Sequence, residues 1–433
     1  MVSIQKIGRL SGRPVTLKGK GMNMEEVVIT GMGCVSSLGN TPDALWANLL
    51  AGKSGVSNIE KMDTGAYEVH FASEVKEFDD SAYFNARDQK RYSRNIRYAV
   101  YAAMHAVEDS GLVLENVDKS RAGVIVASGM GGMDLYYDGC ASLATKGPRR
   151  VSPFFIPMSI TNMATGEISI RLGFMGPNFV TTSACASSNH ALIAAADQIR
   201  LGRADVMIAG GTEEAVTPVA LSGFANMHAL SRRNDAPEKA SRPFDKDRDG
   251  FVIGEGSAVM VLESRKHAEA RGAKIYATIA GVGLSADAHH ITAPREDGAG
   301  VKLAIENALR DAKLEPKDVG YINTHGTSTP LGDVAECKAI CEVYGDAVKN
   351  LKINSSKSMI GHMLGAASAI EGIISIKSLI DQKVHGTLNV ENQDPAIALD
   401  VCKDGAVSHS FNYAMSNSFG FGGHNSVVIF GRV

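Results

Sequence analysis

Short apolar runs of strand length alternate along this chain with longer segments whose apolar residues recur at helical spacing. This alternation predicts an α/β fold. We expect strands at 27–30, 123–127, 206–209, 259–262, 275–282, 321–324, 414–417 and 426–430. We expect helices at 43–51, 93–110, 298–313, 332–344 and 364–381, and in the segment that follows Cys185.

The order of these segments indicates an internal duplication. In the first half, the strand at 206–209 follows the helix after Cys185. The run 275–283 opens a similar strand–helix–strand series, which also contains a long apolar helix. We therefore expect two similar halves, residues 24–265 and 266–433, behind an N-terminal extension of residues 1–23.

The N-terminal extension is basic, and it lacks the apolar core of a secretory signal. A transit segment, an expression leader and a simple basic arm all fit its composition. We expect a cytoplasmic protein of a bacterium, or a plastid or mitochondrial one if the extension is a transit segment. Its basic residues are Lys6, Arg9, Arg13, Lys18 and Lys20, and it contains no acidic residue.

Composition narrows the class of protein. Of the 433 residues, 44% are hydrophobic and 21% charged, which is typical of a soluble globular chain. The net charge of −3 gives no basic field for nucleic acid, and no run of 18 apolar residues predicts membrane insertion. The six cysteines form no CxxC pair and suit a reducing compartment. Cys337 and Cys341 share a helix face without a nearby histidine, which favours core packing over metal binding.

Cys185 lies in a run of small residues, Thr181-Thr-Ser-Ala-Cys-Ala-Ser-Ser. We expect a strand at Phe179–Thr182 before it and a helix directly after it. The N-terminal end of a helix favours a thiolate, and small neighbours leave room for a substrate, so the run fits a cysteine nucleophile. A packed core cysteine fits the same run equally well.

Two histidines also lie at the ends of predicted elements. His325 follows the strand at 321–324, at the end where α/β sheets present ligand groups. Lys357 and His362 bracket a turn that leads into an apolar helix. A single histidine is more often structural, but two in turns rich in glycine, serine and threonine favour a site. The glycine clusters of the chain match neither a phosphate-binding loop nor a dinucleotide fingerprint.

Four motifs then occur in a fixed order: the Cys185 run, His325-Gly-Thr-Ser-Thr, Lys357-Ser-Met-Ile-Gly-His362, and Asn417-Ser-Phe-Gly-Phe-Gly-Gly-His-Asn425. Together they resemble the elongating β-ketoacyl-[acyl-carrier-protein] synthases of types I and II, with type II favoured. The resemblance implies a duplicated thiolase-like αβαβα layered sandwich and a homodimer. It also implies fatty acid elongation, by decarboxylative condensation of an acyl thioester with a malonyl thioester. The partner is an acyl carrier protein that brings its own phosphopantetheine, and no metal or other cofactor is implied.

The resemblance assigns roles to the motif residues. Cys185 holds the acyl chain, while His325 and His362 stabilise the enolate that decarboxylation forms. Lys357 orients and polarises the site. The backbone N–H groups of Cys185 and Phe421 form a second oxyanion hole, and Phe421 gates the acyl pocket. Glu336 matches an acid that bonds the lysine region, so we expect a buried Lys357–Glu336 pair.

Other positions match substrate-binding residues of the family. Met130 and Phe224 match the acyl pocket, Thr327 and Thr329 the phosphopantetheine arm, and Phe419 a further substrate contact. A mobile loop at the tunnel mouth is matched by Asp287, His290 and Thr292. For carrier-protein docking we expect the basic residues Lys90, Arg91, Arg94, Arg149 and Arg150, although a solvated charged face explains them equally well. His228 stands where many members carry an arginine.

Two alternatives share these motifs. The first is the ketosynthase of a type II polyketide system, which performs the same chemistry. The second is a non-catalytic partner subunit that sets chain length. Such subunits lack the nucleophile, so Cys185 argues against this alternative.

Overall fold

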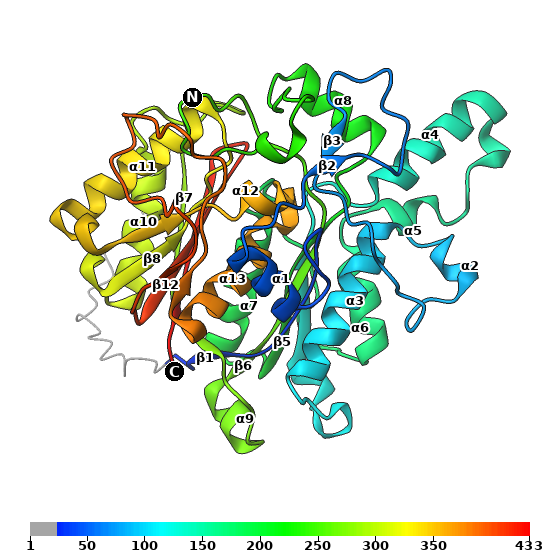
Figure 1. The fold of residues 1–433 in the computed structure, drawn as a ribbon. Helices are drawn as coiled ribbons and strands as arrows, with labels where there is room; N and C mark the ends of the chain where they lie inside the picture. The colour runs from blue at the N-terminus through cyan, green and yellow to red at the C-terminus, as the bar shows by residue number, and fades with distance from the viewer. Residues whose placement is uncertain (1–23) are drawn as a thin grey trace, which may run out of the picture.

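A computed structural model describes residues 24–433, so the predictions for residues 1–23 lie outside the described part (Figure 1). Within that part, nine strands form one mixed sheet in the order β4-β5-β6-β1-β7-β13-β12-β8-β9. These strands are β1 (Val27–Val35), β4 (Ala122–Ala127), β5 (Val206–Glu213), β6 (Gly256–Ser264), β7 (Ala277–Ala286), β8 (Val319–Asn323), β9 (Lys352–Asn354), β12 (Tyr413–Gly420) and β13 (His424–Gly431). Two short hairpin pairs accompany them, β2 (Ser57–Asn58) with β3 (Phe71–Ala72), and β10 (Lys383–Val384) with β11 (Val407–Ser408).

The sheet is symmetric about its centre, where β1 and β7 pair antiparallel. Outward from β1 come β6, β5 and β4, and outward from β7 come β13, β12 and β8. On each side the first two pairings are antiparallel and the third is parallel. The duplication predicted from element order is therefore confirmed, and this symmetry supports our proposed division into residues 24–265 and 266–433.

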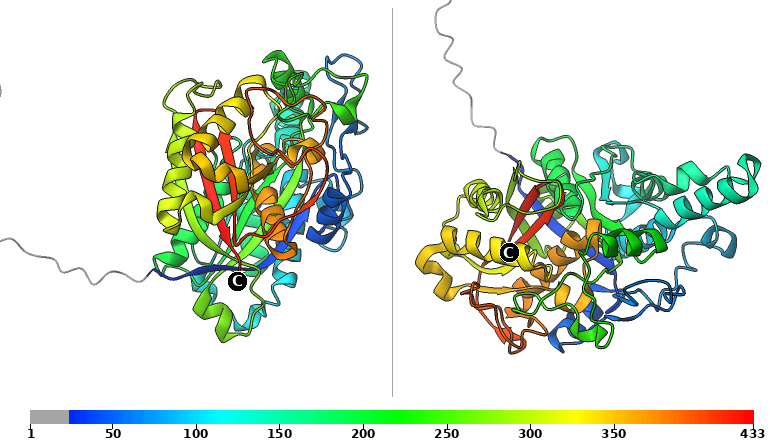
Figure 2. Two further views of the ribbon diagram at one scale, coloured as in Figure 1. Left: turned by 60° about the vertical axis from the view of Figure 1, so that its left-hand side comes forward. Right: turned by 90° about the horizontal axis from the view of Figure 1, so that it is seen from above.

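Helices cover the sheet in three layers (Figure 2). α3 (Arg94–Asp109) and α6 (Met163–Leu172) pack on the outer face of the first half, and α10 (Ala299–Ala312) with α11 (Pro330–Tyr344) covers the second half. Between the two halves lie α7 (Ser187–Arg200) and α13 (Ala367–Asp381), each of which contacts strands of both. The predicted αβαβα sandwich is confirmed, and its largest apolar cluster surrounds the two central helices.

Two pairs of glycines repeat the symmetry at atomic scale. A Cβ at Gly31 or Gly33 of β1 would lie 2.1 Å from a backbone oxygen of α3. At Gly281 and Gly283 of β7, the corresponding distances to α10 are 2.6 and 2.0 Å. Each outer helix therefore rests directly on the backbone of its strand, an approach that only glycine permits.

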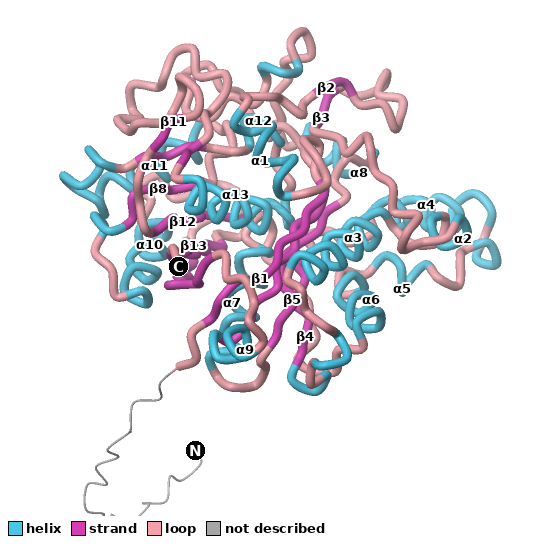
Figure 3. The backbone as a smooth tube through the Cα atoms, turned by 60° about the horizontal axis from the view of Figure 1, so that its bottom comes forward, coloured by secondary structure: helices cyan, strands magenta, loops and turns pink. Residues whose placement is uncertain are grey.

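The remaining helices lie around this core. α4 (Met133–Lys146) projects from the body and buries none of its residues (Figures 1 and 3). No helix among the described residues is long and apolar enough to cross a membrane. The other α-helices are α1 (Pro42–Leu50), α2 (Ala86–Gln89), α5 (Phe155–Ser159), α8 (Pro218–Asn226), α9 (Arg265–Ala270) and α12 (Lys357–Ile360).

One predicted strand is wrong. Phe179–Thr182 carries no strand, and only the bridge between Asn178 and Val124 touches the sheet there. The segment runs along the outer side of β4, the edge strand, so it has a neighbour on one side only. One bridged residue pair with no second pair beside it does not build a hydrogen-bonded ladder, so the segment is not a strand.

Candidate active site

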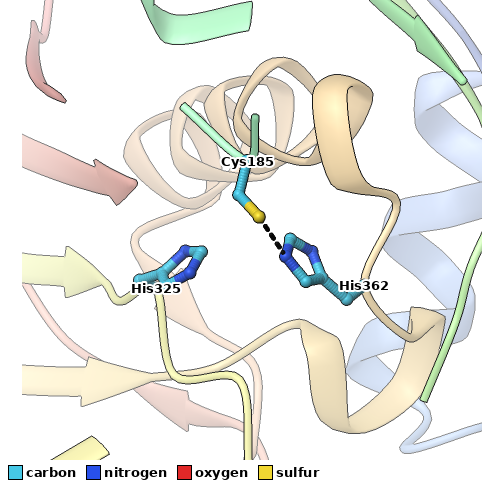
Figure 4. A group of neighbouring side chains, drawn as sticks. All are labelled: Cys185, His325 and His362. Carbon is cyan, nitrogen blue, oxygen red and sulfur yellow. Dashed lines mark hydrogen bonds between the residues drawn. The ribbon is translucent and has the colours of Figure 1, made fainter. Parts of the chain in front are cut away.

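Cys185, His325 and His362 come together from three distant segments (Figure 4). Cys185 lies two residues before α7, and His362 lies shortly before α13. These are the corresponding ends of the two symmetry-related central helices. His325 follows β8 and reaches the same point from the carboxyl end of its strand. The fold thus brings together three residues that lie at least 37 positions apart in the sequence.

The geometry of the three side chains is compact. His362 Nε2 lies 2.9 Å from Cys185 Sγ, which is hydrogen-bond distance for sulfur. One reactive atom from each of the three residues lies within 4.8 Å of the others. The two imidazoles meet edge to face, with ring centroids 5.4 Å apart. A small substrate group at this point can contact the sulfur and both imidazoles together.

A strained turn presents the cysteine. Ala184, directly before it, has φ of +51°, a left-handed conformation that non-glycine residues rarely adopt. Ser187 holds this turn, because its Oγ accepts from the Ser183 N–H at 2.8 Å and donates to the Ala184 carbonyl at 2.6 Å. Strain of this kind persists only where surrounding contacts enforce it, as at functional sites.

The charge state of Cys185 differs from the sequence expectation. Burial raises the pKa of its thiol to about 12, against the lowering effects of Lys357 and of the Phe421 and Cys185 backbone N–H groups. The side chain is only 8% exposed, so loss of solvation outweighs its place near a helix N-terminus. Cys185 therefore rests as a thiol, which would have to lose its proton before the sulfur could act as a nucleophile.

Both histidines are uncharged at neutral pH. Burial lowers the pKa of His325 and of His362 well below the usual value, and the nearby positive charge of Lys357 lowers both further. Neutral imidazole has one N–H donor and one acceptor nitrogen. Each ring can therefore donate one hydrogen bond or accept a proton without first losing one.

The partner of Lys357 is Glu371, and the predicted pairing with Glu336 is wrong. The Lys357 ammonium, at the start of α12, forms an ion pair with Glu371 of α13, and both side chains are 1% exposed. Sequence reasoning missed Glu371, although it is the only charged residue in the apolar stretch 367–376. The carboxylate comes from α13, 14 residues further along the chain.

Glu336 instead holds the His325 loop. Its carboxylate accepts from the backbone N–H groups of His325 and Gly326, both at 2.9 Å, and from Asn417 Nδ2 at 3.1 Å. Burial raises the pKa of Glu336 to about 7, although these three donors favour its anion. Its supporting role is thus exerted through His325.

The Phe421 loop lies directly against the nucleophile. A Cβ at Gly420 would stand 2.6 Å from the Ser183 carbonyl and 3.1 Å from the Cys185 nitrogen, so only glycine allows this contact. The N–H groups of Phe421 and Cys185 both favour negative charge on the sulfur. Phe419 packs beside the His325 ring, with centroids 5.7 Å apart.

Apolar side chains surround the sulfur. Cys185 belongs to a cluster of buried apolar side chains against which the partly buried Met130 and Phe224 pack. Phe224 of α8 also meets Phe251 edge to face at 5.4 Å. The two residues predicted for the acyl pocket are therefore brought beside the nucleophile.

The predicted mouth residues also lie near the Phe421 loop. The Asp287 N–H donates to Gly423 at 2.9 Å, and its carboxylate accepts from Asn425 at 2.7 Å. In the exposed part of the same loop, His290 Nδ1 accepts from the N–H of Thr292 at 3.1 Å. Thr327 and Thr329, after His325, lie with their hydroxyl oxygens 3.0 Å apart.

Three of the five basic residues predicted for docking, Lys90, Arg149 and Arg150, are exposed. Arg91 and Arg94 are partly buried. The Arg91 guanidinium covers the Phe154 ring at 3.7 Å, which links the two clusters, and the Arg94 guanidinium donates to the Val75 carbonyl and packs on Tyr98.

His228 is exposed, and its Nδ1 accepts from Arg232, which also forms an ion pair with Glu68.

Cys185, His325 and His362 are residue types that zinc accepts, and they form the one such group found among residues 24–433. A divalent cation there would lie close to the buried Lys357 ammonium, which already acts on all three pKa values. This repulsion makes a site for polar substrate oxygens a better fit than a metal site.

Comparison with known proteins identifies relatives of the whole chain. The family model for the β-ketoacyl synthase N-terminal domain matches residues 24–268, and that for the C-terminal domain matches residues 276–391. The 3-oxoacyl-[acyl-carrier-protein] synthase 2 of Vibrio cholerae is 49% identical over 95% of this chain and 100% of its own length. The chloroplastic 3-oxoacyl-[acyl-carrier-protein] synthase I of Arabidopsis thaliana is 47% identical over 94% of this chain and 86% of its own.

Solved structures agree with the sequence relatives. A β-ketoacyl synthase from Burkholderia phymatum superposes with a TM-score of 0.89 at 36% identity, covering 95% of this chain and 100% of that one. The ketosynthase of a type II polyketide synthase, solved with its acyl-carrier protein and bound to the hexaketide, gives 0.88 at 33% with the same coverage.

Proposed function

The chain belongs to the β-ketoacyl synthase family, and we propose that it elongates acyl chains by condensing an acyl group on Cys185 with malonyl-carrier protein. Its products are a 3-oxoacyl-carrier protein, CO₂ and the free carrier. The observation that carries this function is the meeting of Cys185 Sγ with His362 Nε2 at 2.9 Å, with His325 alongside. One thiol beside two neutral imidazoles suits acyl storage and enolate stabilisation at one point.

The first step is transfer of the acyl group to Cys185. As the sulfur attacks the thioester carbonyl, His362 Nε2 accepts the thiol proton, which then passes to the departing pantetheine sulfur. The carbonyl oxygen becomes negative and receives the N–H groups of Cys185 and Phe421. The acyl chain extends toward Met130 and Phe224 in the apolar cluster.

The second step is decarboxylation of the malonyl thioester. Its carbon–carboxylate bond breaks, CO₂ leaves, and the electron pair moves toward the thioester oxygen as an enolate. His325 and His362 each donate one N–H to this oxygen, and the neutral rings that their lowered pKa values favour have one N–H each to give. In this step the proton of His362 is on Nε2, the tautomer opposite to the one that accepts from the thiol in the first step. Thr327 and Thr329 flank the expected path of the pantetheine arm.

The third step forms the carbon–carbon bond. The enolate carbon attacks the acyl carbonyl on Cys185, and the same two backbone N–H groups receive the new oxyanion. Collapse of this intermediate breaks the carbon–sulfur bond and releases the cysteine thiolate, which takes up one proton from solvent to restore the thiol. No further cofactor enters these steps, because the carrier protein brings its own phosphopantetheine.

Removal of the nucleophile tests this function. Cys185→Ala should abolish condensation of acyl-carrier with malonyl-carrier, and intact-mass spectrometry should find no acyl-enzyme. Cys402→Ala is a matched control, because Cys402 is also buried, with a pKa raised to about 12, but lies outside the site. Condensation by the Cys185 variant at the wild-type rate would refute the mechanism.

A type II polyketide ketosynthase is the second candidate, favoured by the 0.88 TM-score to such an enzyme. The two functions differ in the fate of the 3-oxoacyl product after one condensation. With malonyl-carrier and a ladder of acyl-carriers but no reductase, a fatty acid enzyme should stop after one two-carbon addition. A polyketide enzyme should continue to poly-β-keto chains, which mass spectrometry distinguishes.

A homodimer is the proposed assembly. Along the edge of the first half, α6 packs on the edge strand β4, α5 contacts α6, and α4 contacts α5. Large apolar side chains are exposed on these elements and on the segment beside β4: Tyr136, Tyr137, Leu143, Ile156, Ile160, Ile170, Met175 and Phe179. A second copy would cover this apolar surface and the unpaired edge.

Carrier docking is proposed at Lys90, Arg91, Arg149 and Arg150, whose positive charge suits an acidic carrier. The bacterial cytoplasm is the proposed location, since several relatives at 46–49% identity are bacterial. The plastid is the alternative, because other relatives are named chloroplastic.

A further inference from the structure

Glu213, at the end of β5, is a fully buried carboxylate that none of the proposed catalytic steps uses. Four donors surround it. Oε1 accepts from Ser128 Oγ at 3.0 Å and from the Met130 N–H at 3.1 Å. Oε2 accepts from the N–H of Gly129 at 2.8 Å and of Gly365 at 2.9 Å. Burial raises the pKa of Glu213, while the four hydrogen-bond donors act against this and favour the ionised carboxylate.

These donors belong to two separate segments, the loop after β4 and the turn before α13. Ser128, Gly129 and Met130 form the loop after β4 that brings Met130 to the acyl pocket. Gly365 lies three residues after His362, in the turn that leads into α13. One carboxylate thus joins the wall of the acyl pocket to the segment that carries a catalytic imidazole.

The surrounding residues are shaped for this contact. A Cβ at Gly129 would lie 2.7 Å from Glu213 Oε2, and one at Gly365 would lie 2.5 Å from the same oxygen. Ser128 extends the connection, since its carbonyl accepts from Thr182 Oγ1 at 2.9 Å in the segment before the nucleophile. The negative charge of Glu213 also acts on Cys185, whose pKa it raises.

We propose that Glu213 is a positioning residue that couples acyl-chain selection at Met130 to the placement of His362. The inference rests on the proposed condensing function for its two half-reactions. An acyl chain that displaces Met130 pulls on Glu213, and through Glu213 on the Gly365 turn. Chain length therefore influences decarboxylation, although the acyl tail never touches the malonyl group.

Glu213→Gln is the direct test, because the amide keeps the size of the side chain but turns one acceptor oxygen into a donor. We expect the variant to lose discrimination across a ladder of acyl-carriers, and malonyl decarboxylation to fall about tenfold or more. The Cys185 thiol should also react with iodoacetamide about tenfold faster near pH 8, because loss of a nearby negative charge lowers its pKa.

Two further variants separate charge from geometry. Glu213→Asp keeps the charge but is one methylene too short, so it should change chain selection while leaving the alkylation pH profile near that of the wild type. Ser128→Ala removes one donor from the pocket loop only, so it should alter chain selection and spare decarboxylation. This milder variant also decides the question if Glu213→Gln does not fold.

Glu263→Gln is the matched control. Glu263 is a buried carboxylate that accepts hydrogen bonds from Thr30 and Arg271. It lies near the last residue of β6, whereas Glu213 is paired with the first residue of that strand. Glu263→Gln should lower thermal stability without changing chain selection or alkylation. Wild-type chain selection and alkylation in Glu213→Gln, or equal changes in Glu263→Gln, would overturn the inference. Alkylation needs no turnover, so it tests Glu213 even if the wild-type protein proves inactive in condensation.

Discussion

At the scale of single residues, the site depends on burial as much as on residue type. Cys185, His325 and His362 sit where solvent is excluded, and this desolvation keeps all three neutral. The neutral state is compatible with each proposed role. A thiol avoids an unpaired buried charge before the substrate arrives, and each neutral imidazole has one N–H to donate to an enolate oxygen. Sequence motifs identify these residues but do not report how deeply they are buried.

His325→Ala should separate the two half-reactions. The histidine is proposed to act on the enolate, so malonyl decarboxylation should fall about 10²–10³-fold, while acyl transfer to Cys185 should fall much less. Decarboxylation is followed by release of CO₂, and acyl transfer by intact mass. Equal loss of both half-reactions would contradict this division.

Glu336 should give the decarboxylation rate an acidic limb. Its pKa is raised to about 7, so the carboxylate that holds the His325 loop is lost as pH falls through that value. We expect the wild-type rate to rise with pH up to about 7. In Glu336→Gln this limb should disappear, because the amide does not titrate, and the rate should stay low throughout. A limb that persists unchanged in the variant would exclude Glu336 as its source.

Raised carboxylate pKa values also affect stability. In the unfolded chain Glu336 would titrate near 4.5, below its folded value. Between these values the folded protein binds more protons than the unfolded chain, so the contribution of Glu336 to stability falls as pH rises from about 4.5 to about 7.

At the scale of elements, the pattern of apolar residues predicted most strands of the main sheet but a smaller share of the helices. All eight strands expected in the main sheet are present, and most of them, such as β1, β4, β5 and β6, are buried along their whole length. α4 was missed since it buries no residue and therefore has no apolar face. β9 was missed because three residues are too few for a pattern.

The contact between α12 and α13 should be testable through its ion pair. Lys357→Met leaves Glu371 unpaired in a buried position, which should lower the free energy of unfolding by about 3–5 kcal/mol. Adding Glu371→Leu removes the stranded charge and should restore much of that stability, as urea unfolding can measure. Activity should stay low in both variants, because the positive charge beside Cys185 is gone. Recovery of activity in the double variant would show that Lys357 acts only on stability.

At the scale of the whole molecule, duplication explains where the chemistry lies. The two halves bring the N-terminal ends of α7 and α13 together between them, one with Cys185 and the other with His362. Each half alone would hold part of a site. The interface between the halves therefore creates an activity that neither half contains.

The proposed dimer should appear in solution as twice the 45.8 kDa mass of the chain. Phe179→Asp places a charge on the exposed apolar surface beside β4 and should shift the protein toward monomer in light scattering. Leu303→Asp is the control, since Leu303 is 45% exposed but lies on α10, which covers the second half. A wild-type protein that is monomeric at micromolar concentration would refute the dimer.

The sequence by itself determined the fold class, the duplication and the identity of Cys185, His325 and His362. These features are encoded locally, in apolar periodicity and in short motifs at element ends. Only the tertiary structure decided that Lys357 pairs with Glu371, that Arg94 turns inward, that Phe179–Thr182 is no paired strand and that Cys185 rests as a thiol. Each of these depends on which distant segments pack together and how much water they exclude, and a linear pattern of residues carries neither quantity.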